Sequence, residues 1–362
     1  MDVRFRERWV GLWRRLLFTS MVTDQKWRCM DHIINPRLPG ADTYFDAQPV
    51  PHATLDDLDL ELVREHMQRA KSELPRFQAP GEPVEFLISR HCLREDAPTL
   101  AGLLVFGRQP QELLSYAGIS LTHFYGPIVT TQVRHSDTLE GTLGTMITAA
   151  EEYLWEHTQH GFDASLGPQR RRVDQYPRTV LRELTVNAVC HRDYSRTSRI
   201  RMQVFADRIE WASPGSLPEP VTVENILYEQ ATRNPTIVRL LYEAGFIEER
   251  GLGLDTVFSA LQEQGLPRPT LLDTGGSFIV TVNGRQNIIA QGDTNGLNEF
   301  QLKMLALLNN QGGFTITDCE RIFPSRSRRM LNRDIKGLID AQYVTRVGQT
   351  NSVRYVPVPQ EA

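Results

Sequence analysis

A carboxylate and a carboxamide stand one helical turn apart in the run L-R-E-L-T-V-N-A-V-C-H-R-D, residues 181–193. At 100° per residue, Glu183 and Asn187 share one side of the predicted helix, and Leu181 lies roughly opposite. An Asn amide oxygen can bind Mg²⁺, and a neighbouring Glu can orient or deprotonate a water molecule beside a nucleotide. Ordinary surface helices also carry this spacing, so the pair needs context before it indicates a nucleotide site.

Glycines further along the chain supply part of that context. Gly215 follows a predicted strand, and Gly251 and Gly253 open a predicted helix. Glycines at a helix start let backbone N–H groups approach a phosphate, which the helix dipole also attracts. The alternative is that they only permit tight turns. The chain has no G-x-x-x-x-G-K-[ST] motif, which argues against a P-loop ATPase or a P-loop helicase.

A stretch near the C-terminus has the composition of a nucleic-acid contact. Between Pro324 and Tyr355 there are seven Lys or Arg against two Asp, in a chain whose net charge is −4. On the helix predicted there, basic residues oppose an apolar stripe of Leu331, Ile335, Leu338 and Ile339. The basic residues are Arg326, Arg329, Arg333 and Lys336, with Arg346 on a predicted hairpin. This arrangement suits DNA, and a solvated charged face or a protein-contact surface is the alternative.

Start signals place helices around these candidate residues. Thr54 and Asp57 form a capping-box pair ahead of a helix predicted over residues 55–69. Asn234 and Pro235 form an N-cap and first-turn pair for a later helix. Alternating apolar residues predict strands over residues 119–125, 200–204, 209–211 and 278–282.

The last segment, from Gly296 to about Val358, reads as three helices followed by two strands. Thr317 and Glu320 are predicted to cap the short second helix. This order of elements is that of a winged-helix domain, so the basic stripe would lie on its third helix.

Composition limits the class of protein. The chain of 362 residues is too long for one ordinary domain, and 40% hydrophobic with 23% charged residues is typical of globular proteins. Four dispersed cysteines form no C-x-x-C pair, so we expect a reducing compartment, the cytoplasm. No run approaches the ~20 apolar residues of a membrane span, so no membrane partner is expected.

Four ordered motifs together resemble a known family. They are R-E-L-T-V-N-A-V-C-H-R-D-Y-S (182–195), R-I-E-W-A-S-P-G-S-L-P (208–218), R-N-P (233–235) and G-F-I-E-E-R-G-L-G-L (245–254). The chain resembles the bacterial and archaeal ATP-binding proteins often labelled RecG-related or Schlafen-AlbA-type regulators. The central domain of that family is a divergent GHKL ATPase domain, the fold shared by gyrase B, MutL and histidine kinases.

The resemblance implies ATP and Mg²⁺ as cofactors and assigns roles to residues. Glu183 would be the general base and Asn187 the Mg²⁺ ligand at the nucleotide. Gly215 would lie in the adenine-side loop, where Ser213 replaces the Asp that reads adenine in GHKL ATPases. Gly251 and Gly253 would lie beside the phosphates, and Arg233 would contact the γ-phosphate from a lid within residues 216–250.

The expected fold is therefore α+β, with a GHKL-like (Bergerat-type) α/β sandwich between an N-terminal mixed α/β module and a C-terminal winged helix. Family members usually begin with an AlbA domain, and this chain joins their pattern only near Tyr44. The expected segments are an N-terminal arm or truncated remnant (1–43), the mixed α/β module (44–170), the GHKL-like ATP-binding domain (171–285), a linker (286–295) and the winged-helix DNA-binding domain (296–362).

The resulting functional prediction is an ATP-binding, nucleotide-responsive protein that binds double-stranded DNA, as a transcriptional regulator or a defence-system component. Slow ATP hydrolysis would fit this prediction, and a protein partner or a homo-oligomer is a further expectation. One alternative is a GHKL-type ATPase that drives a larger complex. Another is a degenerate scaffold that binds no nucleotide, which the Ser213 replacement favours.

Overall fold

The computed structural model describes residues 44–74, 77–78, 81–131, 133–163, 172–247, 253–285, 288–290, 298–341, 343–348 and 353–358. These residues form two compact units, and each unit combines segments that are distant in the sequence. The first unit holds the described residues up to Leu113 and those of the segment Thr232–Gly253. The second holds the segment Leu114–Ala231 and the chain from Leu254 onward. The predicted arm of residues 1–43 lies outside the described residues.

Short helices make up most of the first unit. Its elements are η2 (Phe45–Ala47), η3 (Leu55–Asp57), α2 (Leu60–Glu73), α3 (Pro83–Ser89), β1 (Leu93–Arg94), β2 (Ala97–Pro98), α4 (Leu100–Phe106), α5 (Pro110–Leu113) and α8 (Pro235–Glu243). All residues of α4 are buried, so α4 is the centre of the core of this unit. A Cβ atom at Gly102 would collide with the Cys92 carbonyl, so only glycine permits this close packing.

The capping pair Thr54 and Asp57 is present, but it caps η3 rather than the α-helix. The chain is extended at Leu58, and α2 begins at Leu60. The Asp59 side chain caps α2 by accepting a hydrogen bond from the Glu61 N–H at 3.0 Å. The predicted helix over residues 55–69 therefore starts later than expected and extends further.

Helix α8 is capped by a carboxylate that comes from far away in the sequence. Oδ2 of Asp46 accepts hydrogen bonds from the backbone N–H groups of Thr236 at 2.8 Å and Ile237 at 3.1 Å. Asn234, the predicted capping residue, occupies the N-cap position, but its side chain makes no capping hydrogen bond. The start of α8 was thus predicted correctly, whereas the group that satisfies its N–H donors was not.

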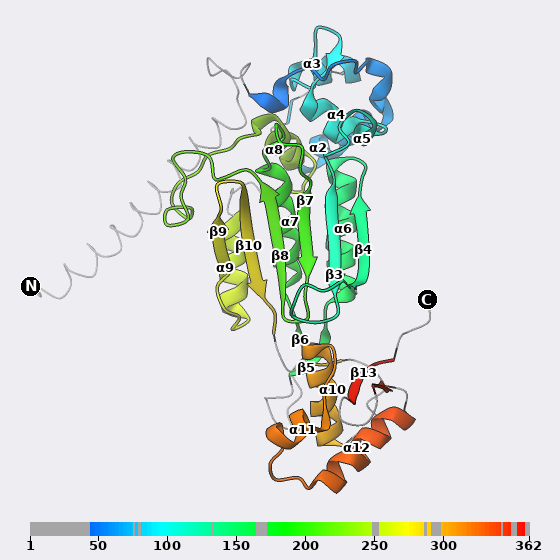
Figure 1. Cartoon of the computed structure of the whole chain (residues 1–362). Helices are drawn as coiled ribbons and strands as arrows, with labels where there is room; N and C mark the ends of the chain where they lie inside the picture. Colours follow the sequence, from blue (N-terminus) through cyan, green and yellow to red (C-terminus); the bar gives the residue numbers. More distant parts are fainter. Residues whose placement is uncertain are drawn as a thin grey trace, which may run out of the picture. The chain divides into compact units, whose positions relative to one another are not determined.

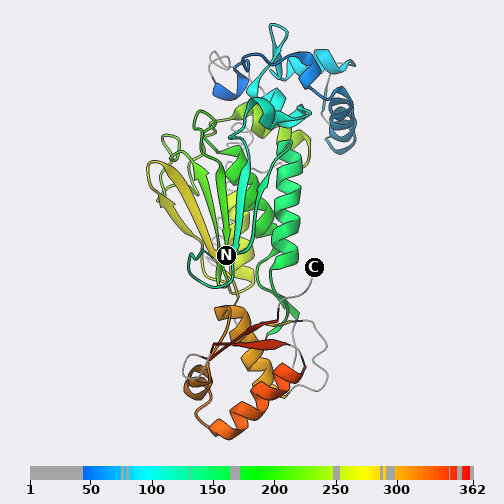
Figure 2. The same ribbon diagram turned by 45° about the vertical axis from the view of Figure 1, so that its right-hand side comes forward.

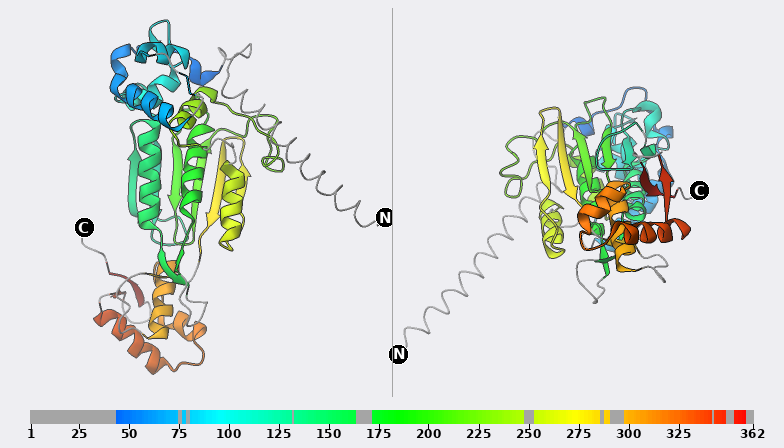
Figure 3. Two further views of the ribbon diagram at one scale, coloured as in Figure 1. Left: turned by 180° about the vertical axis from the view of Figure 1, so that it is seen from behind. Right: turned by 60° about the horizontal axis from the view of Figure 1, so that its bottom comes forward.

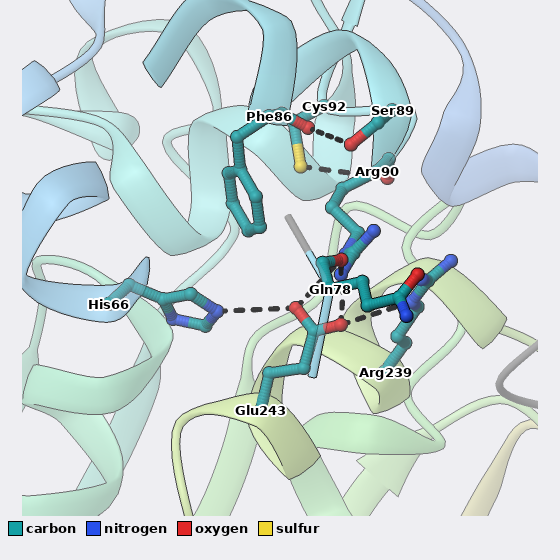
Figure 4. Close-up of polar contacts among 8 residues, drawn as sticks. All are labelled: His66, Gln78, Phe86, Ser89, Arg90, Cys92, Arg239 and Glu243. Atoms are coloured by element: carbon teal, nitrogen blue, oxygen red, sulfur yellow. Dashed lines mark hydrogen bonds and ion pairs between the residues drawn. The ribbon is translucent and has the colours of Figure 1, made fainter. Parts of the chain in front are cut away.

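The other end of α8 carries a buried ion-pair network (Figure 4). Glu243 accepts a hydrogen bond from Arg90 Nε at 2.9 Å and one from Arg239 Nε at 3.2 Å, and His66 Nε2 lies 3.4 Å away. Burial alone would raise the pKa of Glu243, but the His66 hydrogen bond and the two arginine charges hold that pKa below its ordinary value. These contacts hold α8 against α2 and against Arg90, the residue that ends α3.

Asp46 makes the stability of the first unit depend on pH. Burial raises the pKa of Asp46 from an ordinary 3.8 to about 6, although the two N–H groups that it caps act to lower the pKa. The folded chain therefore binds the proton more tightly, so the contribution of Asp46 to stability falls as pH rises from about 4 to about 6. Urea unfolding at several pH values should show wild type losing up to about 3 kcal/mol relative to Asp46→Asn across this range. A difference between the two proteins that does not change with pH would contradict this expectation.

The second unit contains a six-stranded mixed sheet (Figure 1). In spatial order its strands are β4 (Val133–Leu139), β3 (Ile119–Phe124), β7 (Ile200–Val204), β8 (Arg208–Pro214), β10 (Ser277–Asn283) and β9 (Thr270–Asp273). Strands β3 and β7 pair in parallel, with Ile119 opposite Ile200, and all the other neighbours are antiparallel. Helices α6 (Leu143–His157), α7 (Arg178–Cys190) and α9 (Gly253–Glu263) lie on one face of the sheet (Figures 1 and 3).

This sheet crosses the boundary that was predicted near residue 170. Strands β3 and β4, expected in the 44–170 module, pair within the same sheet as the strands from residues 200–283. The predicted linker over residues 286–295 also contains a strand, β11 (Ile288–Ala290). It pairs with β5 (His160–Asp163), which pairs in turn with β6 (Arg172–Asp174). The pairing of β11 with β5 joins residues more than 100 positions apart, a separation that local sequence patterns do not reveal.

The C-terminal segment shows the predicted order of three helices and two strands (orange to red in Figure 2). The elements are α10 (Glu299–Gln311), α11 (Ile316–Ile322), α12 (Arg328–Asp340), β12 (Val344–Val347) and β13 (Arg354–Pro357). Their core contains Met304, Leu308, Phe314, Leu331, Ile335, Leu338 and Val344. The capping box of α11 is formed by Thr315 and Asp318, so the predicted pair Thr317 and Glu320 was wrong by two residues.

Among the described helices, none is long and apolar enough to cross a membrane.

Candidate functional site

Helix α7, which carries Glu183 and Asn187, is joined to strand β8 by two hydrogen bonds. Nε1 of Trp211 donates to Thr185 Oγ1 at 3.2 Å, and the Thr185 hydroxyl donates to the Leu181 carbonyl at 2.8 Å. One turn later, the Ser213 hydroxyl donates to the Ala188 carbonyl at 2.8 Å. Thr185 and Ala188 therefore face the sheet.

Glu183 and Asn187 lie on the side of α7 that faces away from the sheet, because they stand about 160° to 200° around the helix from Thr185. The Glu183 side chain is buried, with the residue 8% exposed. Burial raises the pKa of Cys190, and the charge of Glu183 raises it further.

One polar atom of the Asn187 side chain is unsatisfied among the described residues. Its Nδ2 atom is buried and has no hydrogen-bond partner in the described part of the chain. Unsatisfied buried amide groups cost free energy and are uncommon in native proteins, so a missing ligand is one physical reason for such an atom. An amide can also be turned by 180° to present its oxygen, the atom that Mg²⁺ prefers.

The residues near Asn187 fit a magnesium ion only if the nucleotide completes its coordination. Among the described residues, no group of three or more His, Cys, Asp or Glu could hold a metal ion. Mg²⁺ commonly takes one or two protein ligands and fills its remaining positions with phosphate oxygens and water. A single amide from Asn187 is consistent with that pattern.

Ser213 and Gly215 lie at the end of β8 beside α7. The Ser213 hydroxyl has given its hydrogen to Ala188, so it can only accept a hydrogen bond from a ligand. Gly215 has φ of +102°, a conformation that favours glycine, and its N–H donates to the Gly276 carbonyl at 2.9 Å. The adenine-side loop predicted from the sequence is thus tied both to α7 and to β10.

The remaining nucleotide-site predictions fall elsewhere. Gly251 lies outside the described residues, and Gly253 is the first residue of α9. Arg233 is two residues before the start of α8. Arg233 and Gly253 belong to the first unit, whereas Glu183, Asn187, Ser213 and Gly215 belong to the second.

Arg192, which follows α7, is a structural residue. Its side chain is fully buried, and its Nη2 donates to the carbonyls of Tyr116, Arg196 and Ser198 at 2.9–3.3 Å. The guanidinium also lies over the rings of Tyr116 and Tyr194. These contacts use the arginine to hold the loop after α7.

The basic residues of α12 separate into two groups. Arg329, Arg333 and Lys336 are exposed on α12, and Arg346 is exposed on β12; these four form no ion pair within the described chain. Arg326, predicted to join them, instead forms two contacts with buried Asp334, at 2.7 and 3.2 Å. The reason is that α12 begins at Arg328, with Ser327 as its N-cap, so Arg326 precedes the helix and does not follow its angular pattern.

Further contacts make Arg326 part of the domain core. Its guanidinium stacks 3.9 Å from the centre of the Phe300 ring, and its side chain is only 19% exposed. Asp334 also accepts a hydrogen bond from Asn298 Nδ2 at 2.8 Å. The ion pair joins the turn before α12 to α12 itself, and the contacts with Phe300 and Asn298 join both residues to the start of α10.

We expect Arg326→Ala to destabilise the C-terminal segment by about 3 kcal/mol, because it leaves the Asp334 carboxylate buried without its cation. Arg329→Ala, the matched control on the exposed face, should change stability by no more than about 0.5 kcal/mol. Urea unfolding followed by far-ultraviolet circular dichroism, which reports the loss of helix, would measure both changes in stability. Equal effects of the two substitutions would show that Arg326 has no special structural role.

Comparison with known families identifies the domain that contains the end of β8. Residues 197–282 match the family model described as “Putative ATP-dependent DNA helicase recG C-terminal”. The match covers Ser213, Gly215 and Arg233 and begins after Glu183 and Asn187. The chain therefore contains a RecG-related ATPase-like domain.

A solved structure shares the fold. The crystal structure of the DIP2311 protein from Corynebacterium diphtheriae matches with a TM-score of 0.50 and 18% sequence identity, covering 87% of this chain and 70% of that one. At this identity the similarity shows the fold alone. The comparison with curated proteins gave no match.

Proposed function

We propose that this protein binds Mg·ATP through α7 and the end of β8, and that it is a nucleotide-responsive DNA-binding protein. The observation that carries the nucleotide part is the buried Nδ2 atom of Asn187, which has no hydrogen-bond partner among the described residues and lies one turn from buried Glu183. Both residues lie on a helix that is hydrogen-bonded to the RecG-related ATPase-like domain. This position makes a degenerate scaffold the weaker alternative.

The two residues have separate roles in this proposal. Asn187 holds the magnesium ion, which neutralises phosphate charge when the nucleotide is bound. Glu183 orients or deprotonates the water that attacks the γ-phosphate. Ser213 accepts a hydrogen bond from the adenine amino group, which suits a hydroxyl that has already donated its hydrogen. Contact of Arg233 with the γ-phosphate and a role of Gly251 and Gly253 beside the phosphates stay predictions from the sequence.

We expect Asn187→Ala to weaken Mg·ATP binding by about tenfold or more, because the ion loses its protein ligand. Glu183→Ala should keep the affinity and lower any turnover by about 10² to 10⁴, because the residue acts only on water. Calorimetric titration and phosphate release would measure the two effects. Asn332→Ala and Glu152→Ala, at exposed positions on α12 and α6, are the matched controls. Unchanged binding and turnover in both site variants would contradict the assignment.

The DNA part of the proposal rests on the C-terminal segment. Three helices around one apolar core, followed by a hairpin, have the order of a winged-helix domain. The third helix exposes Arg329, Arg333 and Lys336 and buries its apolar side, so it can enter a major groove. Arg346, on the first hairpin strand, would approach a phosphate. Arg326 is left out of this surface because Asp334 binds it.

Replacing Arg329 and Arg333 together by Ala should weaken duplex DNA binding and reduce its salt dependence. Each phosphate contact that is lost removes about 0.9 from the slope of log K against log salt. A salt titration by fluorescence anisotropy would measure the slope. The double variant Arg64→Ala/Arg69→Ala, exposed on α2, is the matched control. Unchanged affinity and slope in the Arg329/Arg333 variant would instead indicate a protein-contact surface.

Hydrolysis separates this proposal from its main alternative. A nucleotide-responsive regulator should hydrolyse ATP slowly or only with a partner, since a lid must close before the water is positioned. Fast multiple turnover by the purified protein, lost in Glu183→Ala, would favour an ATPase that drives a larger complex. A protein partner, a homo-oligomer and a cytoplasmic location stay predictions.

A further inference from the structure

The Asp273 carboxylate, in the second unit, accepts hydrogen bonds from two separate loops. Asp273 ends β9, and its Oδ1 accepts a hydrogen bond from the Gly275 N–H at 2.8 Å. Its Oδ2 accepts a second hydrogen bond, also of 2.8 Å, from the N–H of Leu217, 56 residues earlier in the chain. Hydrogen bonds to an ionised carboxylate are stronger than those between neutral groups.

The turn that carries Asp273 is itself well ordered by hydrogen bonds. The Thr274 hydroxyl donates to the Ser277 carbonyl at 2.9 Å and accepts from the Ser277 N–H at 3.0 Å. Gly276 at the end of this turn accepts the hydrogen bond from Gly215. The adenine-side loop is therefore attached to the turn at two points, Gly215 and Leu217.

Beyond Leu217 the chain loses these attachments. In the part of the chain that the structure describes, the hydrogen bonds of residues 218–231 join residues of this same segment, as from the Thr222 N–H to Asn225 Oδ1 at 2.6 Å. Tyr228 is 85% exposed. Leu217 is thus the point where this segment leaves the sheet.

We propose that Asp273 is a positioning residue of the nucleotide site, which anchors the adenine-side loop and fixes the point from which residues 218–231 move when nucleotide binds. The inference rests on the proposed nucleotide binding. It adds a residue that the sequence motifs do not include and that lies outside the reacting groups. Asp273 acts through the backbone of Leu217 and Gly275, so it need not touch the nucleotide.

Substitutions of Asp273 can remove one or both of its hydrogen bonds. Both carboxylate oxygens of Asp273 are used as acceptors. An Asn has one acceptor oxygen and an NH₂ group that would face an N–H donor, so Asp273→Asn keeps one hydrogen bond at most. Asp273→Ala keeps neither. Asp207→Ala, in the β7–β8 turn of the same sheet, removes an aspartate that forms an ion pair with its neighbour Arg208, and is the control.

The experiment combines hydrogen exchange with nucleotide titration of the full chain. Without nucleotide, exchange at Leu217 should rise about tenfold in Asp273→Ala, less in Asp273→Asn, and not at all in Asp207→Ala. Mg·ATP should slow exchange across residues 218–231 in wild type and in the control. In Asp273→Ala this protection should be lost, and the Kd for Mg·ATP should rise about tenfold while the melting temperature without nucleotide stays near that of the control.

Each result decides a different point. Wild-type Kd and wild-type ATP protection in Asp273→Ala would overturn the inference while leaving the proposed function intact. A rise in Kd that is matched by a large fall in the melting temperature, with no selective change at residues 217–231, would also overturn it. If wild type binds no Mg·ATP, the proposed function fails, and the inference fails with it. In that case, faster hydrogen exchange at Leu217 in Asp273→Ala would show that the hydrogen bond between them has a structural role alone.

Discussion

The hydrogen bonds between α7 and β8 are the constraint on which the proposed nucleotide site depends. Buried hydroxyl groups must find partners, and Thr185 and Ser213 find theirs across this junction, with Trp211 and Ala188. The same contacts that satisfy these groups turn Glu183 and Asn187 away from the sheet. The orientation of the site residues is therefore a result of satisfying polar groups in the core. A substitution of Thr185 would change the orientation of Glu183 and Asn187 although Thr185 itself faces the sheet.

Features that depend on residues close together in the sequence could be predicted from the sequence. The shared side of Glu183 and Asn187 follows from helical spacing alone, and the start of α8 follows from Asn234 and Pro235. Groups supplied from a distance were not predicted, because no local pattern contains them. The Asp46 carboxylate that caps α8 comes from 190 residues earlier in the chain. Strand β11 likewise pairs with a segment more than 100 residues earlier, so it was read as a linker.

The site residues show this division, and they also show an error in a local signal. The sequence D-T-G-G marks Asp273 as a turn residue, but only the structure shows that its second oxygen holds Leu217. Arg326 was placed on the basic face because helical angles were counted from a residue that precedes the helix. A helix start that is wrong by two residues is enough to turn a buried ion pair into a predicted DNA contact. Arg329, Arg333 and Lys336 lie within α12, so helical angles apply to them, and all three are exposed.

The discontinuity of the first unit has a consequence for the order in which the protein can fold during synthesis. Asp46, His66 and Arg90 leave the ribosome long before α8, which supplies the N–H groups and the Glu243 carboxylate that they bind. Until then, the core around α4 lacks one of its helices and keeps charged groups that have no partners. Strands β3, β4, β7 and β8 emerge in that interval, so the second unit can begin its sheet before the first unit is complete. A nascent chain that stalls before residue 232 would therefore expose the N-terminal core to aggregation or to chaperones.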